Sequence, residues 1–367
     1  MHRPVMQVKI LRRRYTLLEL CVLIKSIIRV ILSPKKIGNF LLVKISLFFK
    51  MSNCLGLPFN INIEPTANCN YECIKCERFS QMYQDDGQTF EGKAMPFEYY
   101  CKLIDEIGDI LLSVRLWHFG EPLFNKDIMR MIKYAKKKNI IVALSSNLSL
   151  LTSSDANALV CSGLDYLVVS FDGGSPETYN RYHGVNYFQK VVENMKLLVS
   201  VKHKLKAQTP FIELQFIVMK DNEGEIPKIK KLSAELGVNK VTFLKLDKDK
   251  INLVKFKLSN YDDILPKNKE FVLNKNNIRR INRCNIPWEG ALVRYSGLVL
   301  PCVEDIGQRH AMGRLIYNGK YLGFRRIWKN DAYCNFRRDI KDGINDIAIC
   351  GNCAQRNNNI QDQIFTC

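Results

Sequence analysis

Three cysteines, Cys69, Cys73 and Cys76, stand four and three residues apart after a strand-like run at 59–64. A short loop with this spacing can place three thiolates around one corner of an iron–sulfur cluster. Three ligands on a four-iron cluster leave one iron open to a small molecule, as a catalytic metal site keeps one open position. A zinc knuckle is the alternative, but zinc sites usually pair C-x-x-C units and no partner lies nearby. We therefore predict an open cluster.

Polar residues suited to binding a small charged molecule follow three later strand-like runs. Gly120 permits close backbone approach, and Glu121 offers a carboxylate to an ammonium group. Asn147 ends the next run, and Ser170 and Asp172 end the one after it. Each motif alone is weak, since an Asp-Gly pair is usually a turn. Together they fall at strand ends, where parallel sheets bind ligands, and so predict one cofactor site.

A second cysteine group, Cys284, Cys302, Cys350 and Cys353, lies near the carboxyl end of the chain. Gly297 stands five residues before Cys302, in a stretch that predicts a hairpin turn followed by a strand. The C-x2-C pair can present two thiolates to one metal ion or cluster. On the cysteines alone, both an iron–sulfur cluster and a zinc ribbon remain open.

Short strand signals alternate with helical ones between residues 58 and 246. The strand-like runs are 59–64, 113–119, 139–145, 165–171, 211–219 and 239–245. The helix-like segments are 97–111, 125–137, 152–161, 186–202 and 224–236. This alternation predicts an α/β fold in which helices cover a parallel sheet. Six units fit a partial (β/α)6 TIM-like barrel better than a closed barrel of eight.

With these motifs in place, residues 58–246 resemble the radical SAM superfamily. The resemblance implies that the three cysteines of the first group bind a 4Fe–4S cluster. It further implies that the amino and carboxylate groups of S-adenosylmethionine chelate the fourth iron. The implied cofactor-binding residues are Gly120, Glu121, Asn147, Ser170 and Asp172, of which Glu121 matches the family's Gly-Gly-Glu motif. Phe119 replaces the first Gly of that motif, and Lys75 stands where the family usually has an aromatic residue lining the adenine.

The pattern C-x12-G-x4-C followed by C-x2-C resembles the SPASM/Twitch extension of radical SAM enzymes. The shorter Twitch form fits better than the seven-cysteine SPASM form, and it implies one auxiliary 4Fe–4S cluster held by Cys284, Cys302, Cys350 and Cys353. We therefore expect a small C-terminal cluster-binding α+β domain. The expected division is a basic amphipathic leader at 1–56, the barrel at 57–246, a linker or solvated insertion at 247–283 and the cluster domain at 284–367.

The resemblance also implies the first chemical step. A reductant such as flavodoxin or ferredoxin passes one electron to the cluster, the sulfonium bond breaks, and a 5′-deoxyadenosyl radical abstracts hydrogen from a substrate. SPASM and Twitch relatives divide between ribosomal-peptide or protein modification and oxidation of sugar or cyclitol alcohols. Because no peptide-leader-binding domain is recognisable, we expect a small or carbohydrate-like substrate, with a peptide as the alternative. A pure electron carrier is disfavoured, since a carrier needs no open iron.

Two acids, Glu304 and Asp305, follow Cys302 closely. If the auxiliary cluster lies beside the substrate, either carboxylate could take the proton that a substrate radical loses on oxidation. We expect Asp305 to be this catalytic base, because its shorter side chain gives a more fixed geometry. The alternative is that both acids are solvated turn residues.

The composition places the chain in a reducing compartment. It has 13 cysteines in 367 residues, which points to metal binding in the cytoplasm if no secretion signal precedes them. Lys25 and Arg29 interrupt the first apolar stretch, and no small-residue cleavage site follows it. No segment approaches 18 uncharged apolar residues, so we expect no membrane span. The expected location is therefore cytoplasmic.

The leader at 1–52 holds eleven Lys and Arg residues and one acid, a large part of the formal net charge of +19. Its apolar residues between Leu17 and Ile31 recur with the spacing of an amphipathic helix. Such a helix could lie on an anionic membrane surface at the inner face of the membrane, or pack on the barrel. Because the basic residues are not interleaved with aromatic ones, we expect no nucleic-acid partner.

Overall fold

The structure is a computed structural model that describes residues 33–79, 93–247, 251–272, 284–351 and 353, together with Ile28 and three short strands. These strands are β1 (Gln7–Ile10), β2 (Arg13–Thr16) and β14 (Ile364–Thr366). β1 and β2 pair as an antiparallel hairpin, which the sequence did not predict. Apart from Ile28, the helix predicted between residues 17 and 31 lies outside the described residues.

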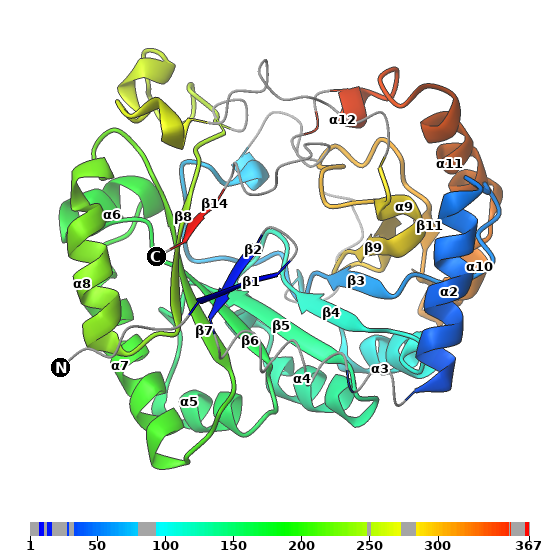
Figure 1. The fold of residues 1–367 in the computed structure, drawn as a ribbon, viewed down its shortest axis with the longest axis horizontal. Coiled ribbons are helices and arrows are strands. Elements are labelled where there is room, and N and C mark those ends of the chain that lie inside the picture. Colours follow the sequence, from blue (N-terminus) through cyan, green and yellow to red (C-terminus); the bar gives the residue numbers. More distant parts are fainter. Residues whose placement is uncertain are drawn as a thin grey trace.

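Six parallel strands form the curved centre of the molecule, each pairing with the next strand of the barrel segment (Figure 1). They are β3 (Asn60–Ile63), β4 (Ser113–Leu116), β5 (Ile141–Ser146), β6 (Tyr166–Ser170), β7 (Phe211–Ile217) and β8 (Lys240–Leu244). Each coincides with a predicted run to within a few residues. In β5, Val142 and Leu144 are fully buried while Ala143 between them is not, which is the alternation expected of a strand with two unlike faces.

Six helices cover the outer face of this curved sheet (Figure 1). They are α3 (Phe97–Ile107), α4 (Ile128–Lys137), α5 (Ser153–Val160), α6 (Pro176–His183), α7 (Phe188–Lys204) and α8 (Ile226–Leu236). In α4, the side chains of Ile128, Met131, Ile132 and Ala135 recur at helical spacing and are buried. The sequence predicted five of these helices and missed α6.

Local sequence fixes the limits of α6. Ser175 and Thr178 form a capping box at its start, and Pro176 occupies a first-turn position where a missing N–H does no harm. Gly184 ends the helix with φ +70°, a left-handed conformation that glycine adopts without strain. The helix therefore has clear boundaries even though its sequence is mostly polar.

The C-terminal segment extends the barrel sheet at both edges. β9 (Gly290–Val293) pairs parallel to β3, and β10 (Leu298–Leu300) and β11 (Gly313–Arg314) continue the sheet antiparallel. β14 pairs antiparallel to β8 at the other edge. The sheet is thus mostly parallel, and the α/β class with a small C-terminal domain is confirmed.

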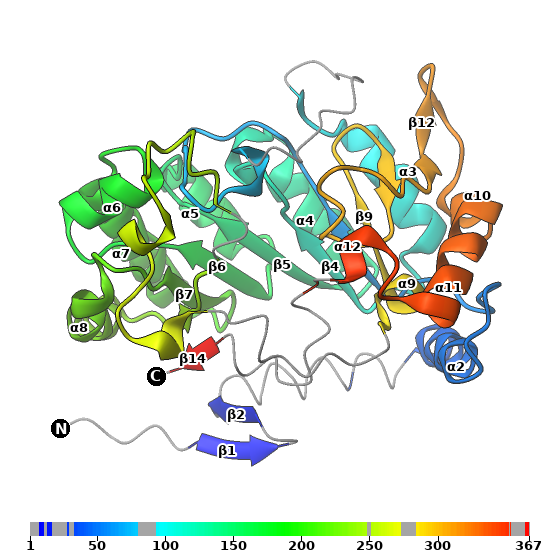
Figure 2. The ribbon, with the colours of Figure 1, turned by 90° about the horizontal axis from the view of Figure 1, so that it is seen from above.

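The remaining elements gather at the β9 end, where α2 lies beside the C-terminal helices (Figure 2). They are α2 (Pro34–Phe48), α9 (Ile286–Glu289), α10 (Phe324–Trp328), α11 (Asp331–Gly343), α12 (Ala348–Gly351) and the hairpin of β12 (Ile316–Tyr317) and β13 (Lys320–Tyr321). None of the described helices is long and apolar enough to cross a membrane.

A buried ion pair joins the barrel to the C-terminal segment. Arg294, just after β9, donates from Nε to a carboxylate oxygen of Glu64 at 2.8 Å. The backbone N–H groups of Phe119 and Tyr295 donate to the same carboxylate. Burial raises the pKa of Glu64, and the positive charge of Arg294 opposes that rise. Residues that follow β3, β4 and β9 therefore contact one another through the carboxylate of Glu64.

Residues 251–265 fall within the predicted linker or solvated insertion, and they pack on the body of the protein. Ile251 and Ile264 form a small apolar cluster with Ile74 of the cysteine loop. Asn252 donates a hydrogen bond to the carbonyl of Phe79 at 2.7 Å. Because Ile251 and Ile264 pack with Ile74, the insertion covers part of the cysteine loop.

Candidate active site

The first cysteine group lies in the loop after β3, at the carboxyl edge of the sheet. Burial raises the pKa of Cys73, and the neighbouring Cys76 and Cys69 raise it further, so the three thiols lie close to one another. Burial is also the main reason why the pKa of Cys76 rises to about 11. Bound iron cations would stabilise the ionised form of these buried thiols, because a metal holds its cysteine ligands as thiolates. This donor set fits the predicted cluster.

Hydrogen bonds to the protein body hold the cysteine loop in shape. Arg78 donates to the carbonyls of Ala67 and Tyr71, both at 3.2 Å. The backbone N–H of Glu72 donates to the carbonyl of His183 at 3.0 Å, so the loop is tied to the end of α6. The loop is therefore fixed by groups outside the cysteine motif.

His183 contacts a predicted cluster ligand directly. Its Nδ1 lies 3.1 Å from the sulfur of Cys73, and its Nε2 accepts the backbone N–H of Asp172 at 3.2 Å. Burial lowers the pKa of His183 to about 3, so the ring is neutral and carries one proton. Since Nε2 accepts, the geometry assigns the proton to Nδ1, which then donates to the Cys73 sulfur. Nothing in the sequence near the cysteines could have predicted this contact.

Glu121 is held at the end of β4 by three donors. Its carboxylate accepts the Ser146 hydroxyl at 2.7 Å and the backbone N–H groups of Asn147 at 2.7 Å and Leu123 at 3.1 Å. Burial raises its pKa, and these donors oppose the rise. A side chain on Gly120 would collide with the carbonyl oxygen of Thr66 at 2.0 Å, so only glycine lets this turn approach the β3 loop.

Asn147 and Asp172 lie at the carboxyl ends of the next two strands after β4. Asn147 donates to the side-chain oxygen of Asn70 in the cysteine loop at 3.2 Å. The carboxylate of Asp172 accepts the backbone N–H of Ile217 at 2.6 Å, and burial raises its pKa to about 7. Ser170 ends β6 two residues before Asp172 and is partly exposed. The predicted cofactor residues thus lie at the ends of three neighbouring strands.

The second cysteine group comes together from separate segments. Burial raises the pKa of Cys302 well above its usual range, and the nearby Cys284 and Cys353 raise it further. Cys350 is buried in α12, and its carbonyl accepts the backbone N–H of Cys353 at 3.2 Å. Among the described residues, no three His, Cys, Asp or Glu groups surround a single metal-ion position. A four-iron cluster takes each thiolate on a different iron.

A cavity of about 430 Å³ is lined by Cys76 of the first group and by residues close in sequence to Cys284 and Cys302 of the second. Its lining combines the cysteine loop, the carboxyl end of β4 and the loop after Cys302. The lining residues are Asn62, Lys75, Cys76, Glu77, Arg115, Trp117, His118, Phe119, Ile286, Val303 and Glu304. The cavity is therefore formed jointly by the barrel and the C-terminal domain.

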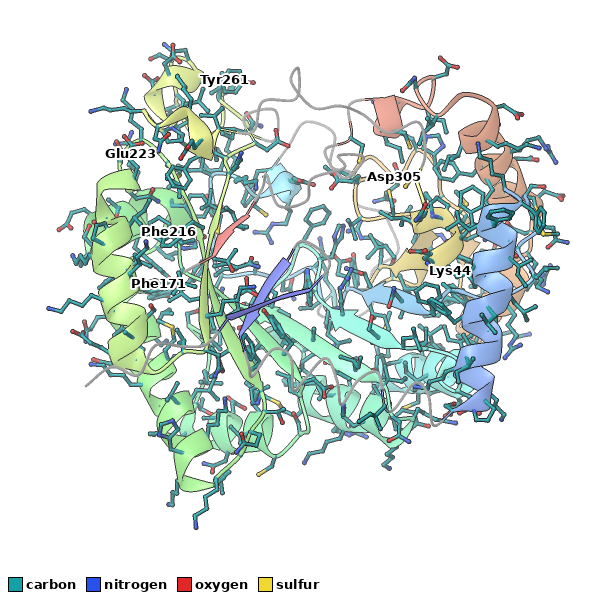
Figure 3. All side chains as sticks on the ribbon, in the orientation of Figure 1. Lys44, Phe171, Phe216, Glu223, Tyr261 and Asp305 are labelled. Carbon is teal, nitrogen blue, oxygen red and sulfur yellow. The ribbon has the colours of Figure 1, made fainter. Side chains whose placement is uncertain are left out.

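Asp305, the predicted base, lies beside this cavity and is not among its lining residues. Figure 3 shows it on the C-terminal side of the barrel opening. It is only 1% exposed, and its two oxygens accept the backbone N–H groups of Arg309 at 3.0 Å and His310 at 2.9 Å. Its neighbour Glu304 lines the cavity. The structure therefore favours Glu304 over Asp305 for contact with a substrate.

Two family models match this chain. One, described as the radical SAM superfamily, matches residues 63–242. The other, the SPASM model described as an iron-sulfur cluster-binding domain, matches residues 284–354. This chain belongs to the radical SAM superfamily. It is a radical SAM enzyme with a C-terminal SPASM domain, and the predicted family is confirmed.

Relatives with curated names share part of this radical SAM enzyme. An AdoMet-dependent heme synthase of Methanosarcina barkeri is 30% identical over 175 residues, 47% of this chain and 46% of that protein. A probable GTP 3′,8-cyclase of Saccharolobus solfataricus is 26% identical over 256 residues, 69% of this chain and 77% of that protein. The chain thus spans less than half the length of the heme synthase.

Solved structures share the fold of this radical SAM enzyme. Streptococcus suis SuiB bound to S-adenosylmethionine superposes with a TM-score of 0.57 at 15% identity, over 78% of this chain and 69% of that chain. anSMEcpe with bound AdoMet and Kp18Cys peptide gives 0.51 at 18% identity, over 77% of this chain and 84% of that chain. These likenesses confirm the predicted fold.

The family membership implies a 4Fe–4S cluster with S-adenosylmethionine and an auxiliary cluster. The described residues fit both groups: one loop offers three thiols beside a held carboxylate, and four more thiols belong to the SPASM domain. Two residues that sequence reasoning missed, His183 and Arg78, act on the first thiol set through contacts in space.

Proposed function

We propose that Cys69, Cys73 and Cys76 bind the catalytic cluster and that the enzyme cleaves S-adenosylmethionine reductively. When bound, the cluster supplies the electron that splits the cofactor into methionine and a 5′-deoxyadenosyl radical. The carboxylate of Glu121 supports this proposal most strongly, because it is buried beside the cysteine loop and already oriented by three donors. A fixed carboxylate suits the ammonium group of methionine.

The other polar residues at the strand ends would orient the rest of the cofactor. Asn147 is held between the cysteine loop and Ser149, whose hydroxyl donates to its side-chain oxygen at 2.8 Å. Ser170 ends β6 and Asp172 follows that strand, and both are proposed to face the ribose and methionine end. The insertion at residues 251–265 covers part of the loop, which helps exclude water from a radical.

The proposed substrate is a small molecule, such as a carbohydrate-like compound, that is oxidised in the cavity beside Cys76. The volume of about 430 Å³ supports this proposal, because it lies in the range of small-molecule sites. Ile286 and Val303, which stand close in sequence to Cys284 and Cys302, line the same cavity, so an auxiliary cluster at these cysteines is proposed to accept the substrate's electron. A flavodoxin or ferredoxin is the proposed reductant.

A peptide substrate is the second candidate. It is favoured by the solved structure of anSMEcpe, which has a bound Kp18Cys peptide. The two candidates differ in what the cavity must admit: a whole small molecule, or one side chain of a longer chain.

Glu304 is the proposed base in place of Asp305. The carboxylate of Glu304 lines the cavity, whereas both oxygens of Asp305 accept backbone donors. A base must reach the proton that it removes. With a substrate in hand, Glu304→Gln should lose product formation, and equal turnover by that variant would exclude the role.

Reductive cleavage is tested with anaerobically reconstituted protein, dithionite and S-adenosylmethionine. The wild-type protein should form 5′-deoxyadenosine, and the variant with Cys69, Cys73 and Cys76 changed to Ala should form none. Cys161→Ala is the matched control, because Cys161 is exposed at the C-terminal end of α5 and belongs to neither cysteine group. Undiminished cleavage by the triple variant would overturn the assignment.

We also propose that α2 mediates peripheral contact with an anionic membrane. Its inward face mixes Val43 with polar groups: Lys36 donates to the carbonyls of Leu111 and Asn139, and Asn39 makes two hydrogen bonds with the backbone of Leu57. An apolar ridge is exposed, and it consists of Leu41, Leu42, Ile45, Phe48 at 81% and, just after the helix, Phe49 at 67%. Cations surround this apolar ridge: Lys35, Lys44, Lys50, Arg325, Lys329 and Lys341.

Vesicle flotation tests the membrane contact without removing α2, whose inward face is tied into the core. Phe48→Ser with Phe49→Ser should reduce binding to phosphatidylserine vesicles by tenfold or more, because each Phe contributes roughly 1.5–3 kcal/mol when buried. Phe124→Ser, an exposed Phe outside the ridge, should leave binding unchanged. Equal flotation of the double variant and wild type would remove the proposal.

A further inference from the structure

Arg115 occupies the middle of β4 on the face that looks into the barrel. Its neighbours Val114 and Leu116 are fully buried on the helix-covered face, and strand alternation places Arg115 on the opposite one. β4 pairs in parallel with β3 so that Arg115 stands beside Asn62. Both residues line the cavity next to Cys76. A guanidinium and an amide thus lie side by side at its floor.

Among the described residues, Arg115 makes no ion pair and no hydrogen bond. Arg115 is exposed, whereas two fully buried arginines of the protein have partners. Arg294 is paired with Glu64, and Arg337 donates to the carbonyls of Pro287, Ser52 and Trp328. The Arg115 side chain is open to solvent on the cavity wall, and desolvation by the surrounding protein lowers its pKa. A guanidinium that lines a cavity without a counter-ion is available to pair with an anionic ligand.

The Asn62 side chain is in the same condition. Its residue is 9% exposed, and its amide makes no hydrogen bond within the described part of the chain. The amide atoms are not among the fully buried ones, so they remain accessible from the cavity. Two unsatisfied donors from adjacent strands therefore face the same space.

The cavity lining has other ionisable groups. Lys75 is its second cation, Glu77 and Glu304 are its acids, and His118 also lines it. Lys75, Glu77, His118 and Glu304 each have an interaction of their own within the protein. Arg115 is consequently the charged group of the lining whose charge the described residues leave uncompensated.

We propose that Arg115 and Asn62 bind an anionic group of the substrate, a carboxylate or a phosphate. Guanidinium presents two parallel N–H donors that match the paired oxygens of either group, and the amide of Asn62 adds a third donor. The anion lies at the floor of the cavity, and the rest of the substrate extends toward Cys76 and Glu304. This inference rests on the proposed function, because it takes the cavity as the substrate site.

Anaerobic calorimetry on the reconstituted enzyme tests the site with two probes, inorganic phosphate and succinate, at constant ionic strength. At least one should bind the wild-type enzyme saturably, with a Kd on the order of 1 mM. Arg115→Gln should weaken that binding at least tenfold, and Asn62→Ala by a smaller factor. Arg130→Gln, an exposed arginine on α4, should match the wild type. The two probes distinguish a phosphate site from a carboxylate site.

Labelling with phenylglyoxal and peptide mapping gives a second measurement on the unaltered enzyme. An unpaired guanidinium facing a cavity should react, and the anion that binds should slow the labelling of Arg115 at least fivefold without slowing that of Arg130. Binding of neither probe, or equal binding by wild type and Arg115→Gln with no protection of Arg115, overturns the anion site.

The two proposals can fail separately. Arg115-dependent anion binding without formation of 5′-deoxyadenosine would overturn the proposed function and support the anion site. Cleavage of S-adenosylmethionine without anion binding would support the proposed function and overturn the anion site.

Discussion

The catalytic cysteine loop and the auxiliary cysteine set gather thiols over different lengths of chain. Cys69, Cys73 and Cys76 belong to one loop, whose shape is held by Arg78 and by hydrogen bonds to the end of α6. The auxiliary thiols come from the segment before α9, the loop after β10 and the region of α12. The first set therefore depends on one loop and its contacts with α6, whereas the second depends on how the whole C-terminal domain folds onto β3.

The largest expected effect is the loss of iron when the ligands of one cysteine set are removed. Cys302→Ala with Cys353→Ala should lower the iron of reconstituted protein from about eight to about four atoms per chain, because one four-iron cluster loses its ligands. Metal analysis by mass spectrometry measures this, with Cys161→Ala as the control. Stoichiometric zinc in freshly isolated protein would favour a zinc ribbon at the auxiliary set.

Breaking the ion pair between the domains should have the next largest effect. Arg294→Ala leaves the buried carboxylate of Glu64 without its partner, which costs about 3–5 kcal/mol of unfolding free energy. Denaturant titration compares it with Arg130→Ala on the surface. The double variant with Glu64→Ala should lose less than the sum of the single losses. Additive losses would mean that the pair does not couple the domains.

Glu121→Gln should weaken S-adenosylmethionine binding by roughly 10–100-fold, since a hydrogen bond to a charged group contributes about 1.5–3 kcal/mol. The pH dependence follows from the raised pKa of Glu121. The wild-type affinity should fall as the pH drops through that raised pKa, because only the carboxylate attracts the ammonium group. Equilibrium dialysis should find no such fall in the variant. A parallel fall in both proteins would assign it to another group.

His183→Phe should give the smallest effect, a lower midpoint potential of the catalytic cluster. An N–H donor to the Cys73 sulfur stabilises the reduced cluster, and losing about 1 kcal/mol corresponds to roughly 40 mV for one electron. Redox titration followed by electron paramagnetic resonance measures the shift. His203→Phe, on the exposed side of α7, is the control. An unchanged potential would leave His183 with a packing role only.

Local signals in the sequence predicted much of the barrel. Apolar runs between turn residues located the six strands, and the cysteine spacing with Glu121 indicated the cofactor end. Helix α6 was missed because most of its sequence, PETYNRYH, is polar; only Tyr179, Tyr182 and His183 are buried. Its caps were visible in the sequence, but they do not by themselves indicate a helix.

Contacts between distant residues could not be predicted in the same way. His183 reaches Cys73 across 110 positions, and Arg294 reaches Glu64 across 230. No periodicity or spacing connects such pairs, because only the finished sheet brings them together. The choice between Glu304 and Asp305 depended on side-chain direction in an irregular turn, where the alternation that orders strands is absent.

The pairing of β9 with β3 has a consequence for how the chain is made. Until β9 emerges from the ribosome, one side of β3 presents unpaired N–H and C=O groups, as any edge strand does. Most of the barrel is synthesised before that edge is covered, and exposed edges invite pairing between chains. The C-terminal segment thus completes a surface on which the solubility of the nascent barrel depends. A chain that ends at residue 246 should aggregate rather than fold into a smaller working barrel.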